Sequence, residues 1–138
     1  VMRADIHGLK IFEIGEKYYF EDLGIRNSVR GLNYLGDVGK LIENAVYMQL
    51  LRRGYRVFTG KDGEREIDFI GEKNGERIYV QACYLLADEK TLQREFGNLM
   101  FIEDNYPKYV VTMDPLPPRK TYKGIRQLHL KEFLTMEE

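Results

Sequence analysis

The sequence contains one cysteine, no tryptophan and four prolines in 138 residues. A single thiol, Cys83, excludes a disulfide within the chain and is typical of proteins kept in a reducing cytoplasm. No apolar run approaches the roughly 20 residues needed to cross a bilayer, and the first residues lack the pattern of a signal peptide. We therefore expect a cytoplasmic protein with no membrane partner. Because the chain begins with Val1 rather than Met, we expect a domain of a longer polypeptide.

The sequence also lacks an excess of one charge, since 21 basic residues stand against 22 acidic ones. A dedicated high-affinity nucleic-acid binder usually carries a clear positive excess. Arg52, Arg53 and Arg56 form a local basic cluster, which we interpret as part of the solvated surface. What is present is the composition of an ordinary globular protein, 43% apolar and 12% aromatic, in a length that suits one domain with its own core.

Two principal helices are predicted, over residues 37–53 and 89–103. In the first, apolar residues recur at three- and four-residue steps, which makes one packed stripe. Asp37 is a suitable N-cap for this helix, and Gly54 is a typical stop after its last turn. Asp88 takes the capping position of the second helix. Both segments therefore have a recognisable start and a helical core.

Strands are predicted on both sides of the second helix. The first three follow one another closely enough to form antiparallel hairpins, whereas the fourth follows a helical crossover and is expected to be parallel to a neighbour. A short helix is expected after the last strand. This order favours an α/β fold with a mixed sheet flanked by helices on both faces. The predicted strands are 55–59, 65–71, 77–85, 108–113 and 125–130.

The N-terminal part of the sequence is less regular. Residues 9–21 indicate two short strands or a hairpin around Gly15, and residues 23–30 indicate a short helix. We therefore divide the chain into an N-terminal extension or hairpin, residues 1–16, which joins a main domain formed by residues 17–138.

The Asn-Gly pair at residues 74–75 fixes the expected register of the central hairpin. Asn-Gly between alternating strands is the strongest short-range hairpin signal and favours a two-residue type I′ turn. With these two residues as the loop, apolar residues face each other on one side of the hairpin and polar residues on the other. A slip by one residue would destroy that agreement. The facing pairs are Phe69–Val80 and Ile67–Ala82 on the apolar side, and Asp68–Gln81 and Glu66–Cys83 on the polar side.

The polar side of this hairpin is a candidate metal site. Asp68 and Gln81 carry adjacent side-chain oxygens, and Glu43 joins them if the first helix packs on the same face. Crowded carboxylates repel each other, which raises their pKa values unless a cation relieves the repulsion. Hard cations such as Mg²⁺ take oxygen ligands. We therefore predict Glu43, Asp68 and Gln81 as metal ligands, and interpret Glu66 as a solvated strand residue.

Each of these residues also has a purely structural interpretation. Glu43 is spaced to pair with Lys40 on the helix surface. Gln81 is placed to hydrogen-bond Asp68, and a lone cysteine such as Cys83 often serves as a small buried apolar side chain. Asp68 is harder to explain in this way, because aspartate is depleted in strands. The choice between a working site, the relic of a site and plain packing stays open at this point.

The arrangement resembles the PD-(D/E)xK, or restriction-endonuclease-like, superfamily. Its signature is a helix glutamate, a strand aspartate and a hairpin strand that ends in (Asp/Glu)-x-Lys. Glu43 matches the first, Asp68 the second, and Gln81-Ala82-Cys83 occupies the third segment. The chain more closely resembles the C-terminal endonuclease-like domain, itself of unknown function, of a prokaryotic AAA-type ATPase family. The segments that carry this resemblance are 17–27, 39–57, 66–70, 78–84 and 104–114.

The resemblance implies a restriction-endonuclease-like core and, in active members, a Mg²⁺ or Mn²⁺ ion. Gln81 departs from the pattern by placing a neutral amide where active members have an acid. Cys83 departs further, because it replaces the lysine that helps orient the attacking water and stabilise phosphate charge. A thiol has no fixed positive charge and cannot take over that role. Lys40, one helical turn before Glu43, is a candidate substitute.

We therefore expect a catalytically degenerate endonuclease-like domain of an AAA-type ATPase, which acts in substrate or partner recognition with candidate contact to DNA. One alternative is an active Mg-dependent DNA nuclease with a displaced lysine, and a second is a module for protein interaction only. No Walker-type phosphate loop is present, so we expect no cofactor in this chain and ATP only in the ATPase part. The expected partners are the ATPase module of the same polypeptide, DNA and, as a candidate, a second copy of the chain.

Overall fold

The computed structural model describes residues 2–5, 11–16, 34–62, 65–84, 86, 89–114 and 121–136. These residues form an α/β fold with three helices and a mixed sheet. The helices are α2 (Tyr34–Arg52), α3 (Glu89–Met100) and α4 (Leu130–Thr135). The strands are β1 (Met2–Asp5), β2 (Ile11–Glu16), β3 (Arg56–Asp62), β4 (Arg65–Lys73), β5 (Glu76–Ala82), β6 (Lys108–Thr112), β7 (Thr121–Tyr122) and β8 (Ile125–His129).

Five of the strands, β3, β4, β5, β6 and β8, form the centre of the sheet, whose full order is β2-β1-β3-β4-β5-β6-β8-β7. The strands β3 and β5 each pair antiparallel with β4, as expected from the short connections between them. After the crossover through α3, β6 lies parallel to both β5 and β8. The prediction of a mixed sheet is therefore confirmed.

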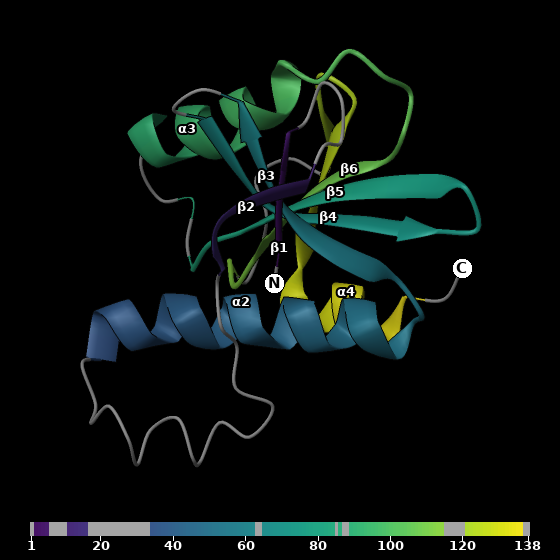
Figure 1. Ribbon diagram of the computed structural model, residues 1–138. Coiled ribbons are helices and arrows are strands. Elements are labelled where there is room, and N and C mark those ends of the chain that lie inside the picture. The colour runs from purple at the N-terminus through teal and green to yellow at the C-terminus, as the bar shows by residue number, and fades with distance from the viewer. Residues whose placement is uncertain are drawn as a thin grey trace.

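The helices cover both faces of the sheet, which was also predicted. Figure 1 shows α3 on one side of the strands and α2 with α4 on the other. Each face has its own cluster of buried apolar residues, and we call them the α3 core and the α2 core. The α3 core includes Ile67, Ile70, Tyr79, Phe96, Leu99 and Val110. The α2 core includes Val46, Leu50, Phe69, Val80, Ala82, Val111 and Phe133.

The predicted start of α2 is wrong, whereas its predicted end is confirmed. The helix begins at Tyr34, so Asp37 lies inside it and the prediction of Asp37 as N-cap is wrong. A glycine in a helix costs only about 1 kcal/mol, and Gly36 therefore did not stop the helix. At the other end Gly54 has a φ of 89°. Its N–H donates to the carbonyl of Leu51, and the N–H of Tyr55 donates to that of Leu50. This is a Schellman motif, and it ends the helix at the glycine that the sequence predicted as its stop.

The expected turn at Gly15 is wrong, because β2 runs through this residue without a break. The antiparallel partner of β2 is β1, and β1 in turn pairs in parallel with β3. Residues 2–5 and 11–16 therefore extend the same sheet. The short helix predicted at 23–30 and the cap at Asp88 lie outside the described residues. The helix α3 ends at Met100, three residues before its predicted end.

Candidate functional site

The hairpin of β4 and β5 has the register that its turn residues predict. Asn74 and Gly75 have positive φ angles of 53° and 80°, as a type I′ turn requires. Phe69 is paired with Val80, and further along the ladder Glu72 is paired with Arg77. A side-chain ion pair of 3.0 Å joins Glu72 and Arg77. The turn chemistry therefore fixed the pairing of these two strands.

A β-bulge interrupts β4 at Asp68. On the β3 side Phe58 pairs with Ile70, whereas Gly60 pairs with Ile67. Two residues of β4, Asp68 and Phe69, thus lie opposite one residue of β3, and the strand bends there. As a result, residue 67 packs in the α3 core together with residue 70, while Phe69 packs in the α2 core. The prediction that Ile67 shares an apolar face with Ala82 is therefore wrong, since Ala82 belongs to the α2 core.

Beyond the Phe69–Val80 pair, side chains replace the backbone ladder between β4 and β5, and we call this place the β4–β5 gap. The N–H of Asp68 donates to the side-chain Oε1 of Gln81 at 2.6 Å. The N–H of Ala82 donates to Oδ2 of Asp68 at 2.8 Å. Nε2 of Gln81 donates to the carbonyl of Glu66 at 3.2 Å. Asp68 and Gln81 thus lie together, as predicted, and both bridge the two strands.

Gln81 is buried so deeply that its hydrogen bonds decide its role, since only 2% of its surface is exposed. Its amide satisfies one donor and one acceptor of β4 that the interrupted ladder leaves unpaired. Asn98 of α3 also donates to the carbonyl of Glu66, at 3.1 Å. The sequence analysis missed Asn98, whose only signal was its place beside the buried stripe of α3. Buried polar groups need such partners, because a lost hydrogen bond costs about 1–3 kcal/mol.

Cys83 follows β5 and packs partly buried against the α3 core. Burial, with smaller contributions from the carboxylates of Glu95, Asp114 and Asp68, raises the pKa of the Cys83 thiol to about 12. The thiol is therefore neutral at physiological pH and has negative groups around it. At the position where the nuclease signature has a lysine, this chain has a neutral group in a negative field.

Two glutamates from opposite helices approach each other near this place. Burial raises the pKa of Glu95 on α3; Arg94 opposes the shift, and the charge of Glu43 on α2 adds to it. Glu43 is therefore close enough to Glu95 to act on its charge. The sequence analysis missed Glu95, although its position three residues after Leu92 and four before Leu99 places it on the buried stripe of α3.

These residues form a weak donor set for a metal ion. In the described part of the chain, no three Asp, Glu, His or Cys side chains gather closely enough to hold one. Oxygens of Asp68 and Gln81 already accept backbone N–H groups. Lys40, the candidate substitute for the missing lysine, is exposed on α2. Glu43, Asp68 and Gln81 as metal ligands therefore remain a prediction, and no catalytic step is derived through an ion.

Comparisons with known proteins assign no family. No family model matches the chain, and no solved structure matches it. An uncharacterised protein of Haemophilus influenzae is similar, with 38% identity over 111 residues. The match covers 78% of this chain and 26% of the relative, so the chain spans about a quarter of the protein it matches. No helix in the described segments is long and apolar enough to cross a membrane.

Proposed function

We propose that this chain is a catalytically degenerate, restriction-endonuclease-like domain of an AAA-type ATPase, and that it recognises a substrate or partner of that ATPase. The order of α2, β4 and β5, with Glu43, Asp68 and Gln81 on them in turn, supports the proposal because it follows the order of the superfamily signature. The bulge at Asp68 supports it too, since bulges are frequent beside active sites.

The observation that carries the proposal of degeneracy is the bonding in the β4–β5 gap. The side chains of Asp68 and Gln81 bridge the two strands here. Asp68 accepts a hydrogen bond from the Ala82 N–H, and Gln81 accepts one from the Asp68 N–H and donates one to the Glu66 carbonyl. A catalytic carboxylate directs at least one oxygen at a metal or a water, whereas Oδ2 of Asp68 and both polar atoms of the Gln81 amide are directed at the backbone of the sheet. The relic of a site therefore acts as a structural bridge.

Electrostatics in the same place argue against phosphate hydrolysis. A phosphodiester is an anion, and its transition state needs positive charge or hydrogen-bond donors aimed at the phosphoryl oxygens. Here the neutral thiol of Cys83 lies within the field of Glu95, Asp114 and Asp68. These groups repel a phosphate, and residue 83 no longer supplies the positive charge of the signature lysine.

Attachment to an ATPase rests on the resemblance and on the length of the relative. The matched 111 residues are 26% of the Haemophilus influenzae protein, which leaves ample chain for a further module. A recognition domain next to an ATPase module would bind the target on which the ATPase acts and would need no catalytic activity of its own. The candidate targets are DNA, a protein partner and a second copy of the chain.

A nuclease assay tests the absence of catalysis. The purified chain is incubated with supercoiled plasmid in Mg²⁺ and, separately, in Mn²⁺, beside an Asp68→Asn variant that keeps the acceptor for the Ala82 N–H. We expect the same background in both proteins. Cleavage by the wild type that disappears in the Asp68→Asn variant would overturn the proposal and establish the active nuclease.

The active nuclease has one observation in its favour. Arg94 is a cation whose charge lowers the pKa of the Cys83 thiol, so it lies near the position of the missing lysine. Its own ion pair with Glu95 is 3.4 Å long and exposed on the arginine side, which leaves the guanidinium able to move. If cleavage is found, loss of activity in Arg94→Gln with retention in Lys40→Gln would assign the displaced cation to Arg94.

A binding assay then separates DNA from protein targets. Phosphate contacts make DNA affinity fall steeply as salt rises. A duplex that binds at low ionic strength and is released by added salt supports DNA contact. A flat, negligible signal at low salt removes DNA from the proposal, and capture of the ATPase module by this domain then becomes the measurement that decides.

A further inference from the structure

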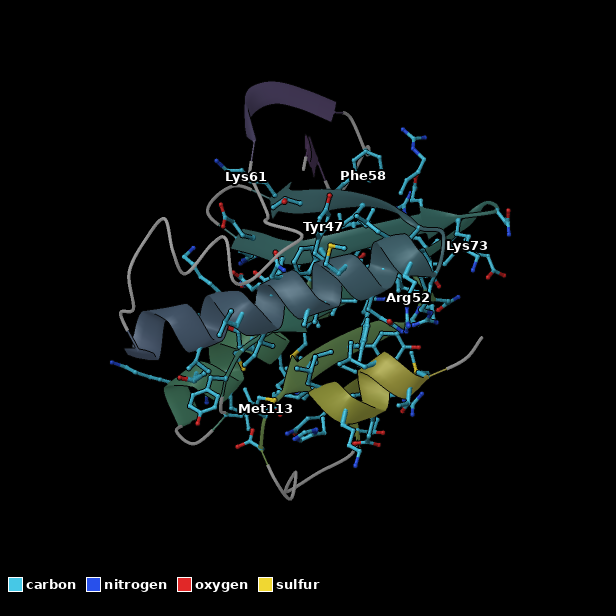
Figure 2. The ribbon with its side chains drawn as sticks, turned by 90° about the horizontal axis from the view of Figure 1, so that it is seen from below. Tyr47, Arg52, Phe58, Lys61, Lys73 and Met113 are labelled. Carbon is cyan, nitrogen blue, oxygen red and sulfur yellow. The ribbon has the colours of Figure 1, made fainter. Side chains whose placement is uncertain are left out.

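A pocket lies at the C-terminal end of α3, where this helix comes close to the hairpin of β7 and β8 (Figure 1). Its volume is ≈ 400 Å³, which falls within the range of about 300–1,000 Å³ that is typical of small-ligand sites. Three buried side chains of the α3 core line it, those of Leu99, Ile102 and Ile125. Figure 2 shows the opposite side of the sheet, which α2 and α4 cover. The pocket is therefore at the edge of the α3 core.

Exposed apolar side chains gather at this pocket. Of the five large apolar side chains that are exposed in the described part of the chain, three lie within residues 100–106. Met100 and Tyr106, which are 42% and 38% exposed, line the pocket, and Phe101 follows Met100 in the sequence. Apolar side chains that gather on a surface in this way mark a place where something binds.

The loop that carries Tyr106 is held in place by its own hydrogen bonds. The carboxylate of Asp104 accepts from the Tyr106 N–H at 3.0 Å and from the hydroxyl of Tyr79 at 2.5 Å. The guanidinium of Arg77 lies over the Tyr106 ring, 5.6 Å from its centre, and donates to the Tyr79 hydroxyl at 3.1 Å. A site whose side chains are fixed before the ligand arrives loses little entropy on binding.

The charged groups of the lining favour a neutral ligand. The ammonium of Lys108 has three N–H donors, and three acceptors surround it: the carbonyl of Asp104 at 2.8 Å, Oδ1 of the same residue at 2.9 Å and the carbonyl of Tyr106 at 3.0 Å. Asp104 and Lys108 thus neutralise each other as an ion pair. Lys123, the remaining charged residue of the lining, has interactions of its own. A ligand that binds here therefore needs no net charge.

Asn105 is the polar side chain of the lining that is open to a ligand. It is exposed, and its amide makes no hydrogen bond to the residues that the structure describes. A carboxamide presents an acceptor and a donor side by side, which matches the N6 donor and the N7 acceptor on one edge of adenine. Tyr106, the next residue, has an aromatic ring on which a base can stack. Met100 adds a thioether, which makes favourable contacts with aromatic rings.

We propose that this pocket binds an unpaired adenine base, which stacks on Tyr106 and hydrogen-bonds to Asn105 through its N6–N7 edge. Such a base has two sources, a free nucleoside or nucleotide and an unpaired position of a single strand. In both the base itself is neutral, in agreement with the paired charges of the lining. The pocket shares no lining residue with the β4–β5 gap, so the site is independent of the proposed function.

Titration of the isotope-labelled chain with adenosine, followed by NMR, tests the proposal with a probe that carries no charge. We expect saturable shifts of the Asn105 side-chain amide and of the Tyr106 N–H, with an affinity that added salt leaves unchanged. Inosine is the matched control ligand, because it keeps the purine ring system and N7 but has an acceptor in place of the N6 donor. It should bind about tenfold more weakly than adenosine.

Two variants separate stacking from recognition of the base edge. Tyr106→Leu keeps the backbone bond to Asp104 and an apolar side chain but removes the ring, so both nucleosides should bind about tenfold more weakly. Asn105→Ala should weaken adenosine about tenfold and abolish its preference over inosine. Tyr84→Leu is the matched control, because Tyr84 is also 38% exposed and lies outside the lining. It should leave both affinities unchanged.

A short single strand of deoxyadenosine and its duplex with thymidine identify the source of the base. Tighter binding of the single strand than of adenosine, with none of the duplex, assigns the site to an unpaired base of a strand. Binding of adenosine that the strand does not exceed assigns it to a free nucleoside or nucleotide. The proposal is overturned if neither adenosine nor the single strand binds saturably, or if the wild type binds adenosine and inosine equally. An equal loss of affinity in Tyr84→Leu and Tyr106→Leu overturns it as well.

Discussion

The backbone N–H of Asp68 donates a 2.6 Å hydrogen bond to the side chain of Gln81, across the place where β4 and β5 stop pairing through their backbones. Gln81 returns a bond from its amide nitrogen to the carbonyl of Glu66. The amide thus takes the place of a missing rung of the ladder. A residue that fills a gap in this way is held in place by the sheet. Its replacement should therefore lower the free energy of unfolding.

Replacing Gln81 by leucine should therefore destabilise the domain. The change leaves the Asp68 N–H buried without a partner and removes one of the two donors to the Glu66 carbonyl. We expect a loss of about 2–4 kcal/mol in the free energy of unfolding. Urea denaturation followed by circular dichroism measures it.

Gln127→Leu is the matched control for this change. Gln127 is as deeply buried, at 2% exposure, and lies in register with the same residue of β6 as Gln81, Val110. Among the described residues its amide has no hydrogen-bond partner. Leucine relieves that cost, so we expect Gln127→Leu to be neutral or stabilising. Equal losses in the two variants would mean that the bonds of Gln81 contribute nothing.

Two variants of Asp68 should separate its bridging role from a role in chemistry. Asp68→Asn keeps a side-chain oxygen to accept from the Ala82 N–H, whereas Asp68→Ala removes it. We expect the alanine variant to lose about 1–3 kcal/mol and the asparagine variant to stay close to the wild type. Thermal unfolding of the three proteins gives the comparison. A large loss in Asp68→Asn would show that the negative charge itself is needed.

The register of the hairpin could be read from the sequence because it depends on local chemistry. Asn74 and Gly75 both tolerate the positive φ of a type I′ turn, and the charge pair of Glu72 and Arg77 agrees with the same alignment. Every pair from the turn to Phe69 follows from these facts alone. Proximity of Asp68 and Gln81 was therefore predictable.

The bulge was not predictable, because it lies in the pairing of β4 with β3 and not in the pairing within the hairpin. Thr59 lies opposite two residues of β4, and the alternation of apolar and polar residues along β4 does not indicate this. The acidic neighbours of Cys83 were missed for a similar reason. Glu95 comes from α3 and Asp114 follows β6, so their approach depends on how the crossover packs on the sheet. Local patterns fix strand pairing, and tertiary packing decides which charges meet.

The thiol of Cys83 should react slowly in the folded protein. Its pKa is raised from 9.0 to about 12, mainly by burial, and only the thiolate is nucleophilic. At pH 8 the thiolate fraction is then about a thousandfold lower than in the unfolded chain, and alkylation by iodoacetamide should slow by a similar factor. Mass spectrometry with and without urea measures both rates. Equal rates would show an accessible, ionised thiol.

The same shift predicts how stability depends on pH. A thiol whose pKa is raised by folding contributes stability that is present below the unfolded pKa and is lost as the pH rises toward 12. The wild type should therefore lose stability above about pH 9 relative to Cys83→Ala. The cavity left by the alanine lowers stability by a constant amount, so the difference between the two curves isolates the titration.

Glu95→Gln should stabilise the domain at neutral pH. Burial raises the pKa of Glu95, with Arg94 opposing and Glu43 adding to the shift. Folding therefore favours the protonated acid, and the benefit of that preference is lost as the pH rises through the folded pKa. At neutral pH the folded protein bears the free-energy cost of burying an ionised carboxylate, and the neutral amide of glutamine removes that cost. The stability gained by Glu95→Gln should therefore shrink as the pH falls below the ordinary carboxyl pKa, where the acid is protonated in both states.

Chemical denaturation at pH 7 and pH 4 tests that prediction, with Glu103→Gln as the control because Glu103 is exposed just beyond α3. The Arg94–Glu95 pair that the change removes is exposed on the arginine side and is worth little. A Glu95→Gln variant that is less stable than the wild type at pH 7 would show that the carboxylate has favourable contacts that outweigh its burial.

Two glycines should respond oppositely to alanine, because one is packed against a ring and the other is not. A Cβ added at Gly71 on β4 would lie 3.0 Å from the Tyr55 ring and 3.3 Å from Ile78. Overpacking of this kind costs about 1–3 kcal/mol. A Cβ at Gly97 on α3 meets nothing within 4 Å, so alanine there should add about 0.5–1 kcal/mol through helix propensity. Urea midpoints of Gly71→Ala and Gly97→Ala give the two signs, and a stabilising Gly71→Ala would mean that the Tyr55 ring moves aside at little cost.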